Sequence, residues 1–171
     1  WELGDADAVA RAMETAAHKV SLTLRNNRLV PNAIEPRAIN AQWDPIEERL
    51  DVRMTHQNPI GMRMFYAAAY GLAAEHKLRM VSPDVGGGFG SKAHNYPEEV
   101  AVAFAAKLVC RPVKWTAERT EAFLSDAHGR DHVTTATLAL DADGRFLAIE
   151  VDTKAAMGAY LSSTGSLIPT Y

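Results

Sequence analysis

The chain has 171 residues, of which 47% are hydrophobic and 23% are charged, and these proportions are typical of a globular protein with a sizeable core. A formal net charge of −3 gives no electrostatic reason to expect a nucleic acid or an anionic membrane surface as partner, and no run of about 18 apolar residues could cross a bilayer. The single cysteine, Cys110, excludes an internal disulfide and a metal site built from several cysteines. Because the chain begins at Trp1 rather than Met and ends at Tyr171 inside an apolar stretch, we expect it to be part of a longer protein.

The beginning of the chain predicts a helix, a strand and a loop. Residues 5–17 have apolar side chains at helical spacing, among them Val9 and Met13, which predicts an amphipathic helix. Residues 20–25 alternate apolar with polar side chains and predict a half-buried strand. Residues 26–37 contain two prolines and three asparagines, so we expect a loop there.

Two alternating segments then predict an antiparallel hairpin. They cover residues 38–43 and 49–55, and Asp44-Pro45 supplies the turn between them. The hairpin leads into a helix that we expect to run to about residue 72. The predicted buried face of that helix comprises Ile60, Met64, Ala67 or Ala68, and Leu72.

A strand-to-helix corner lies at Thr55-His56-Gln57-Asn58-Pro59. Asn58 suits the N-cap of the following helix, and Pro59 suits its first turn. Gln57 is therefore held at a rigid corner, where its amide could face a shared cavity. The alternative is that Gln57 bonds to nearby backbone, which is the usual fate of such a glutamine.

The most distinctive stretch is the glycine loop, which has the sequence Gly86-Gly87-Gly88-Phe89-Gly90-Ser91-Lys92. Four glycines in five positions allow positive φ angles and a close approach of the backbone to a bulky group. A short strand at 78–81 precedes the loop, and Tyr96-Pro97-Glu98-Glu99 opens a helix after it. A strand, glycine loop and helix in this order can present main-chain N–H groups to an anionic or oxo ligand, although a connector without a ligand remains the alternative.

Two common nucleotide-binding motifs do not match this loop. The dinucleotide motif requires a third glycine where this chain has Ser91. The phosphate-binding P-loop requires glycine directly before lysine and a serine or threonine after it, whereas Ser91 precedes Lys92 and Ala93 follows it. The loop is therefore not predicted to bind a nucleotide in either of these ways.

The second half of the chain predicts two more helices and a second hairpin. The helix at 97–109 has Val100, Phe104 and Leu108 at four-residue spacing, and we expect Cys110, which follows it, to be a buried small hydrophobe. A short strand at 112–116, a helix at 118–124, and a hairpin of 132–140 with 146–156 about Gly144 complete the prediction, with Leu147, Ile149 and Val151 on the inner face of the hairpin.

A charged segment near residue 130 could suggest a metal site. It contains Asp126, His128, Asp131 and His132, but their spacing matches no known ligand template, and a solvated loop is the favoured interpretation. No general acid or base adjoins the glycine loop in sequence, where Ser91 and Lys92 are the only reactive residue types. The residues alone thus predict a single α+β domain over 1–171, with a mixed sheet, antiparallel hairpins and packed helices.

Several long motifs, found in this order, resemble the large subunit of the xanthine dehydrogenase family, and more closely its aerobic carbon monoxide dehydrogenase-like branch. They are THQNP, VSPDVGGGFGSK, RPVKWTAERTEAFLSDAHGRDH, and LALDADGRFLAIEVDT with GAYLS. The resemblance covers essentially the whole chain and is strongest from about Thr55 to Ser163. It implies the N-terminal part of the molybdenum cofactor-binding region of such a subunit.

The resemblance also implies a chemistry and a site. Members of this family are molybdenum hydroxylases, which bind a molybdenum–molybdopterin cofactor, usually the cytosine dinucleotide form in bacteria, and oxidise a substrate carbon with oxygen from water. Gln57 is implied to lie near the oxygen ligands of the molybdenum. The main chain of the glycine turn is implied to contact the cofactor at Gly87, Gly88, Phe89 and Gly90.

Partners and location are implied in the same way. They are the remainder of the large subunit, an FAD-binding medium subunit, an iron–sulfur small subunit with 2Fe-2S clusters and a small-molecule substrate, all in the cytoplasm. The general base of the family, a glutamate, is expected downstream of Tyr171, so this chain is predicted to contain no catalytic residue and no direct metal ligand. We expect the 171 residues alone to be inactive.

One position departs from the purine-oxidising members of the family. These carry a substrate-binding glutamate four residues after the phenylalanine of the motif, and this chain has Ala93 there. A purine substrate is therefore not expected, whereas carbon monoxide, aldehydes and N-heterocycles stay open. The second hypothesis is a non-catalytic stand-alone module with at most partial cofactor binding.

Overall fold

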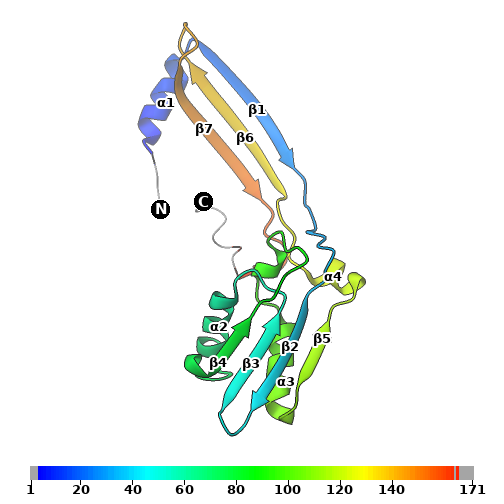
Figure 1. Cartoon of the computed structure of the whole chain (residues 1–171). Helices are drawn as coiled ribbons and strands as arrows, with labels where there is room; N and C mark the ends of the chain where they lie inside the picture. The colour runs from blue at the N-terminus through cyan, green and yellow to red at the C-terminus, as the bar shows by residue number, and fades with distance from the viewer. Residues whose placement is uncertain (1–3, 164, 166–171) are drawn as a thin grey trace. The chain divides into compact units, whose positions relative to one another are not determined.

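The chain forms two compact units in the computed structural model, which describes residues 4–163 and residue 165 (Figure 1). Unit one comprises Trp1–Leu29 and Arg130–Met157, and unit two comprises Val30–Gly129 and Gly158–Tyr171. That residues 1–171 belong to one domain stays a prediction from the sequence. Helices combine with antiparallel and mixed sheets in the described part of the chain, which confirms the predicted α+β class.

Unit one is a three-stranded antiparallel sheet with one helix. Its elements are α1 (Ala6–Thr15), β1 (His18–Asn26), β6 (His132–Leu140) and β7 (Phe146–Ala155), and the strand order is β1-β6-β7. The side chain of Asp5 caps α1 by accepting a hydrogen bond of 2.8 Å from the Ala8 N–H. The turn between β6 and β7 has Gly144 at φ +81°, so the predicted second hairpin is confirmed.

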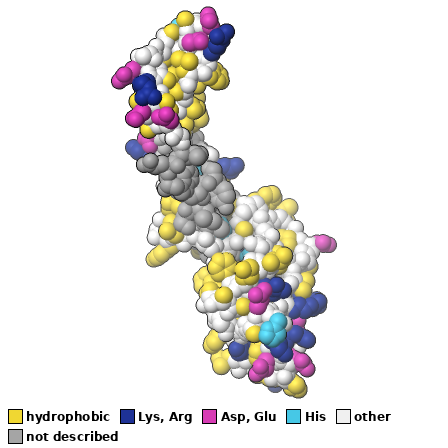
Figure 2. Space-filling model, turned by 90° about the vertical axis from the view of Figure 1, so that its left-hand side faces the viewer, with side chains coloured by type: hydrophobic (Ala, Val, Ile, Leu, Met, Phe, Trp, Pro, Cys, Tyr) yellow, Lys and Arg dark blue, Asp and Glu magenta, His cyan; other side chains and the backbone are white. Residues whose placement is uncertain are grey.

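One face of this sheet is apolar and exposed, which corrects two expectations. In the register of the sheet, Leu22 lies opposite Ala136, and Ala136 lies opposite Val151. Leu22 and Val151 are 58% and 55% exposed, and hydrophobic side chains are visible on the surface of unit one in Figure 2. The predicted half-buried strand and the predicted inner face of the hairpin are therefore wrong about burial. Alternation determines which side chains share a face, but burial requires a second layer.

Unit two is a four-stranded mixed sheet with helices. The strand order is β4-β3-β2-β5, in which β3 and β4 are parallel and the other pairs are antiparallel. The strands are β2 (Ala38–Asp44), β3 (Arg49–Met54), β4 (Leu78–Val81) and β5 (Val113–Thr116). The helices are α2 (Pro59–Ala68), α3 (Pro97–Val109) and α4 (Arg119–Ser125), with 3₁₀ turns η1 (Glu75–Lys77) and η2 (Ser91–Ala93).

The core of unit two lies between its sheet and the helices α2 and α3. The strands contribute every second residue, as the predicted first hairpin requires. The fully buried members include Ile39, Ala41, Leu50, Val52, Met54, Met62, Tyr66, Ala103 and Ala106. None of the helices in the described part of the chain is long and apolar enough to cross a bilayer.

The buried face of α2 differs from the prediction. Asn58 caps the helix and Pro59 occupies its first turn, as predicted, but Ile60 and Met64 are exposed. Met62 and Tyr66, four residues apart, face the sheet instead. Because α2 is apolar on more than one side, several sets of its residues have helical spacing. The direction in which the chain enters the helix at Asn58 decides which of these sets faces the sheet.

The buried face of α3 differs in the same way, although its limits are those predicted. Phe104 and Leu108 are exposed, whereas Ala103 and Ala106 are fully buried against the sheet. Small side chains let the helix axis approach the strands closely, so size decides the packing more than hydrophobicity does. Cys110 is also exposed, contrary to expectation, because it ends α3 at φ +49°, where the chain turns away.

Candidate functional site

Two segments that are distant in sequence leave the same edge of the unit-two sheet. The corner at Gln57 follows β3, and the glycine loop follows β4. Because β3 and β4 are parallel, with Arg53 opposite Val81, their carboxyl ends lie side by side. The fold of the sheet therefore brings the predicted corner and the predicted loop together.

Direct contacts join the corner to the loop. The Gly90 N–H donates a hydrogen bond of 3.0 Å to Gln57 Oε1, and the Gln57 N–H donates one of 2.9 Å to the Lys92 carbonyl. A Cβ atom on Gly88 would lie 2.5 Å from Gln57 Oε1, so any larger residue would have to displace the Gln57 side chain. Gly88 thus lets Gln57 pack directly against the loop.

The loop backbone adopts conformations that few residues tolerate. Gly87, Phe89 and Gly90 have φ angles of +97°, +50° and +92°. A bulky residue such as Phe89 rarely adopts a left-handed conformation, and Phe89 is 76% exposed. Such strain persists where the surrounding structure imposes it, and it is common at ligand-binding sites.

The loop offers several hydrogen-bond donors to a ligand. Within the described residues, the main-chain N–H groups of Gly87, Gly88 and Phe89 have no hydrogen-bond acceptor. The space where a Cβ of Gly90 would stand contains no other atom within 4 Å. Consecutive N–H groups without an acceptor suit a ligand that carries several acceptor oxygens.

A buried histidine stabilises the corner, and sequence reasoning did not assign it a role. His56 Nδ1 accepts a hydrogen bond of 2.9 Å from the Asn58 N–H, and His56 Nε2 lies 3.3 Å from the His94 carbonyl. Burial lowers the pKa of His56, and this effect exceeds that of the hydrogen bonds that raise it. The ring is therefore neutral with its proton on Nε2, donated to His94. Ser82, which directly follows β4, donates to the His56 carbonyl at 2.6 Å.

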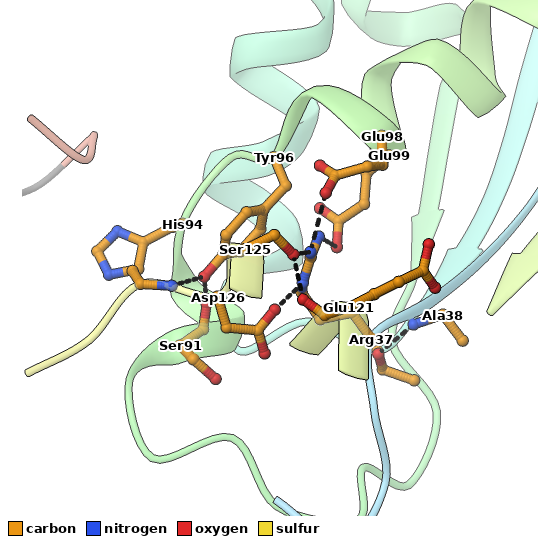
Figure 3. A network of polar contacts seen from close by, with 12 residues as sticks. Arg37, Ala38, Ser91, His94, Tyr96, Glu98, Glu99, Glu121, Ser125 and Asp126 are labelled. Carbon is orange, nitrogen blue, oxygen red and sulfur yellow. Dashed lines mark hydrogen bonds and ion pairs between the residues drawn. The ribbon is translucent and has the colours of Figure 1, made fainter. Parts of the chain in front are cut away.

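A buried arginine organises the other side of the loop (Figure 3). Arg37 is fully buried, and its guanidinium lies 3.6 Å from the centre of the Tyr96 ring. It donates to Asp126 at 2.7 Å, to Glu98 at 3.2 Å and to Glu99 at 3.5 Å. The Tyr96 hydroxyl donates to the Ser91 carbonyl at 2.8 Å and accepts from the Ala127 N–H at 2.9 Å. Through Tyr96, this cluster fixes the end of the glycine loop.

One positive charge in this cluster faces three carboxyl groups. Burial opposes the charge of Arg37, but the hydrogen bond and charge of Asp126, with the charges of Glu99 and Glu98, raise its pKa overall. Burial raises the pKa of Glu99 to about 7 despite the opposing effect of Arg37. The raised pKa of Arg37 indicates strong ion pairs, whereas the raised pKa of Glu99 indicates that its own pair with Arg37 is weak. The distances support a weak Glu99 pair, because the Asp126 oxygen lies 2.7 Å from the guanidinium and the Glu99 oxygen lies 3.5 Å from it.

This arrangement predicts that stability falls as pH rises. In the folded chain the pKa of Glu99 is about 7, whereas its ordinary value is 4.5. As the pH rises through this range, the free energy of unfolding therefore falls by up to about 3 kcal/mol. Replacing Glu99 by Gln should remove much of this loss. The midpoint of thermal unfolding should then fall less between pH 5 and pH 8 in the variant than in the wild type. Glu75→Gln is the control, because Glu75 forms an exposed ion pair with Arg63 and is not among the charges that shift the pKa of Glu99, so this variant should keep the pH dependence of the wild type. Equal pH profiles for Glu99→Gln and the wild type would contradict the assignment.

The structure locates two groups of residues that the sequence singles out. Gln57, Gly87, Gly88, Phe89 and Gly90 lie together, whereas two of the residues considered for a metal site form ion pairs. These are Asp126, which binds Arg37, and Asp131, which binds Arg28 at 2.8 Å. The described residues contain no group of three histidine, cysteine or acidic side chains that could hold a metal ion. No sequence signal identifies Arg37, because its partners are 61 to 89 residues away.

Comparison with known proteins places this arrangement among cofactor-binding domains. Residues 1–171 match the family described as the molybdopterin cofactor-binding domain. The chain is similar to the carbon monoxide dehydrogenase large chain of Hydrogenophaga pseudoflava, with 35% identity over 94% of this chain and 20% of that protein. It is also similar to the nicotine 6-hydroxylase large subunit of Paenarthrobacter nicotinovorans, with 33% identity over 92% of this chain and 19% of that protein.

Solved structures give the same result. The chain is similar to carbon monoxide dehydrogenase from Oligotropha carboxidovorans, with a TM-score of 0.83 and 31% identity over 90% of this chain and 19% of that one. It is similar to quinoline 2-oxidoreductase from Pseudomonas putida 86, with a TM-score of 0.82 and 34% identity over 91% of this chain and 20% of that one. The chain thus spans about a fifth of the length of the relatives it matches.

Proposed function

Because this chain belongs to the molybdopterin cofactor-binding domain family, we propose that its glycine loop and Gln57 form one wall of the molybdenum–molybdopterin site of a hydroxylase large subunit. The observation that carries this proposal is the packing of Gln57 against the loop. The Gly90 N–H binds Gln57 Oε1 at 3.0 Å, beside main-chain donors that have no acceptor within the described residues.

The residues present fit this cofactor. Oxo, pyranopterin and phosphate groups accept hydrogen bonds, and the N–H groups of Gly87, Gly88 and Phe89 are fixed donors that lose little freedom on binding. The open space beyond Gly90 leaves room for a bulky group beside the backbone. Lys92 is paired with Glu35 at 2.8 Å, so the loop presents neutral donors at this point and no unpaired cation.

Each site residue has a distinct task in this proposal. Gly87, Gly88 and Phe89 bind acceptor oxygens of the cofactor through their N–H groups. Gly90 orients Gln57 by binding its Oε1, which leaves the Nε2 group of Gln57 as a donor that would help to hold the cofactor. When bound, the cofactor supplies two-electron oxidation of a substrate carbon with oxygen derived from water.

The activity of the whole protein follows as a proposal. The relatives include a carbon monoxide dehydrogenase, a nicotine hydroxylase, a quinoline oxidoreductase and an aldehyde oxidoreductase, so we expect carbon monoxide, an aldehyde or an N-heterocycle as substrate. Ala93 offers no carboxylate beside the loop, which disfavours a purine. The proposal includes the cytosine dinucleotide form of the cofactor, FAD and iron–sulfur partner subunits that accept the electrons, and a cytoplasmic complex.

Metal and pterin analysis of the full-length protein tests this function. We expect about one molybdenum and one pterin for each large subunit, together with turnover of at least one substrate of the three classes. A full-length protein that is folded but contains neither molybdenum nor pterin would refute the proposal. That result would favour the non-catalytic module.

A further inference from the structure

The glycine loop is held at both ends by one residue from a distant segment. Glu35 Oε2 accepts a hydrogen bond of 2.8 Å from the Gly86 N–H at the start of the loop. The same oxygen accepts a hydrogen bond of 2.8 Å from Lys92 Nζ at the end of the loop. The Glu35 N–H also donates to the Gly86 carbonyl at 3.2 Å, so both main-chain groups of Gly86 are bound.

The chain is built closely around this contact. A Cβ on Gly86 would lie 2.7 Å from the Cβ of Glu35, so only glycine permits the approach. The Lys92 side chain is 1% exposed, and within the described residues its only hydrogen bond is to Glu35. A buried ammonium group is costly without a partner, so this pair is under strong constraint.

We infer that Glu35 and Lys92 are positioning residues, which act as a charge-neutral clamp that sets the direction of the Gly87, Gly88 and Phe89 N–H groups. This inference rests on the proposed function, since it concerns how the loop is held for the cofactor. The three donors lie between the two clamped ends, and a loop rich in glycine has no side-chain packing of its own to keep them aligned.

The clamp depends on pH in a defined direction. Burial raises the pKa of Glu35, but the hydrogen bonds from Lys92 and Gly86 and the charge of Lys92 outweigh it, so the pKa lies below its ordinary value of 4.5. A carboxyl group with a lowered pKa stabilises the folded form above its ordinary pKa and loses this effect as pH falls through the lowered value. Glu35 therefore keeps its charge for Lys92 at neutral pH, and the ion pair weakens only in acid.

Two matched substitutions in the full-length protein test the clamp. Glu35→Gln keeps the shape and an oxygen for Gly86 but removes the charge, and Lys92→Met removes the ammonium group at nearly constant length. Glu75→Gln is the control, because Glu75 forms an exposed ion pair with Arg63 at 2.9 Å away from the loop. Hydrogen–deuterium exchange is measured for peptides that cover residues 85–93 and, as a core reference, residues 38–54.

We expect exchange in residues 85–93 to become at least tenfold faster in Glu35→Gln and in Lys92→Met, with residues 38–54 and the Glu75→Gln variant unchanged. The double variant should exceed the larger single effect by less than twofold, because the two residues act as one unit. Molybdenum and pterin retained after gel filtration at pH 7 should fall several-fold in both single variants. Unchanged loop exchange, or independent effects that multiply, would overturn the clamp.

The two readouts separate this inference from the proposed function. A wild-type full-length protein without molybdenum and pterin refutes the function, whereas loop exchange still decides whether the clamp exists. A wild-type protein that is loaded, with variants that exchange faster but retain the cofactor fully, refutes the role of the clamp in holding the donors for the cofactor. Loss of the cofactor together with faster loop exchange supports both.

Discussion

Replacing Gly90 with valine should leave the full-length protein almost without molybdenum, at least tenfold below the wild type. Gly90 has φ +92°, which a β-branched residue adopts only at a cost of roughly 1–2 kcal/mol or more. Its N–H also orients Gln57, and the space beyond its Cα is the space proposed for the cofactor. The valine would therefore both displace the donor of Gln57 and fill the cofactor site. Elemental analysis of the purified protein measures the loss.

A second glycine provides a matched control for the backbone strain. Gly144 has φ +81° and, like Gly90, no atom within 4 Å of the position of a Cβ, but it lies in the turn between β6 and β7 of unit one. Gly144→Val should destabilise the chain by a similar amount and leave the molybdenum content unchanged. Full molybdenum content in Gly90→Val, or equal loss in both variants, would contradict a specific role for Gly90.

Much of the secondary structure is predictable from the sequence, because its signals are local. The antiparallel pairing of β2 with β3 follows from alternation around a proline turn, and the limits of α3 follow from its proline and its period. The buried faces are not predictable in this way. Phe104 is more hydrophobic than Ala103, yet Ala103 is the residue that packs against the sheet, because the close approach of two elements favours a small side chain.

The candidate site divides along the same line. Gln57 and the glycine loop carry recognisable motifs, and the parallel pairing of β3 with β4, which no local pattern indicates, brings them together. Glu35 and Arg37 lie in a segment that reads only as a loop. Their partners are 51 to 89 residues away, so their roles appear only when the chain is folded. Glu98 and Glu99 illustrate the difficulty. Two carboxylates in the first turn of α3 are already explained by the helix dipole, so the sequence gives no reason to look for a distant arginine.

Removing the charge of Arg37 should have the largest effect on stability in this chain. Arg37→Leu would leave Asp126, Glu98 and Glu99 close together without a cation, and breaking a buried ion pair in this way costs about 3–5 kcal/mol. Arg37→Lys should recover little, because a single ammonium group cannot donate to three carboxyl groups and stack on Tyr96 at once. The midpoint of thermal or urea unfolding at pH 7 measures both losses.

An exposed arginine supplies the comparison that isolates the effect of burial. Arg28 binds Asp131 at 2.8 Å, but both side chains are at least 40% exposed, so Arg28→Leu should cost no more than about 1 kcal/mol. Because Tyr96 connects Arg37 to the Ser91 carbonyl, Arg37→Leu should also accelerate hydrogen exchange in the glycine loop, whereas Arg28→Leu should not. Arg37→Leu could be no more destabilising than Arg28→Leu only if the three carboxyl groups lost their charge or reached water without Arg37. That result would contradict the role of the Arg37 cluster in fixing the end of the loop.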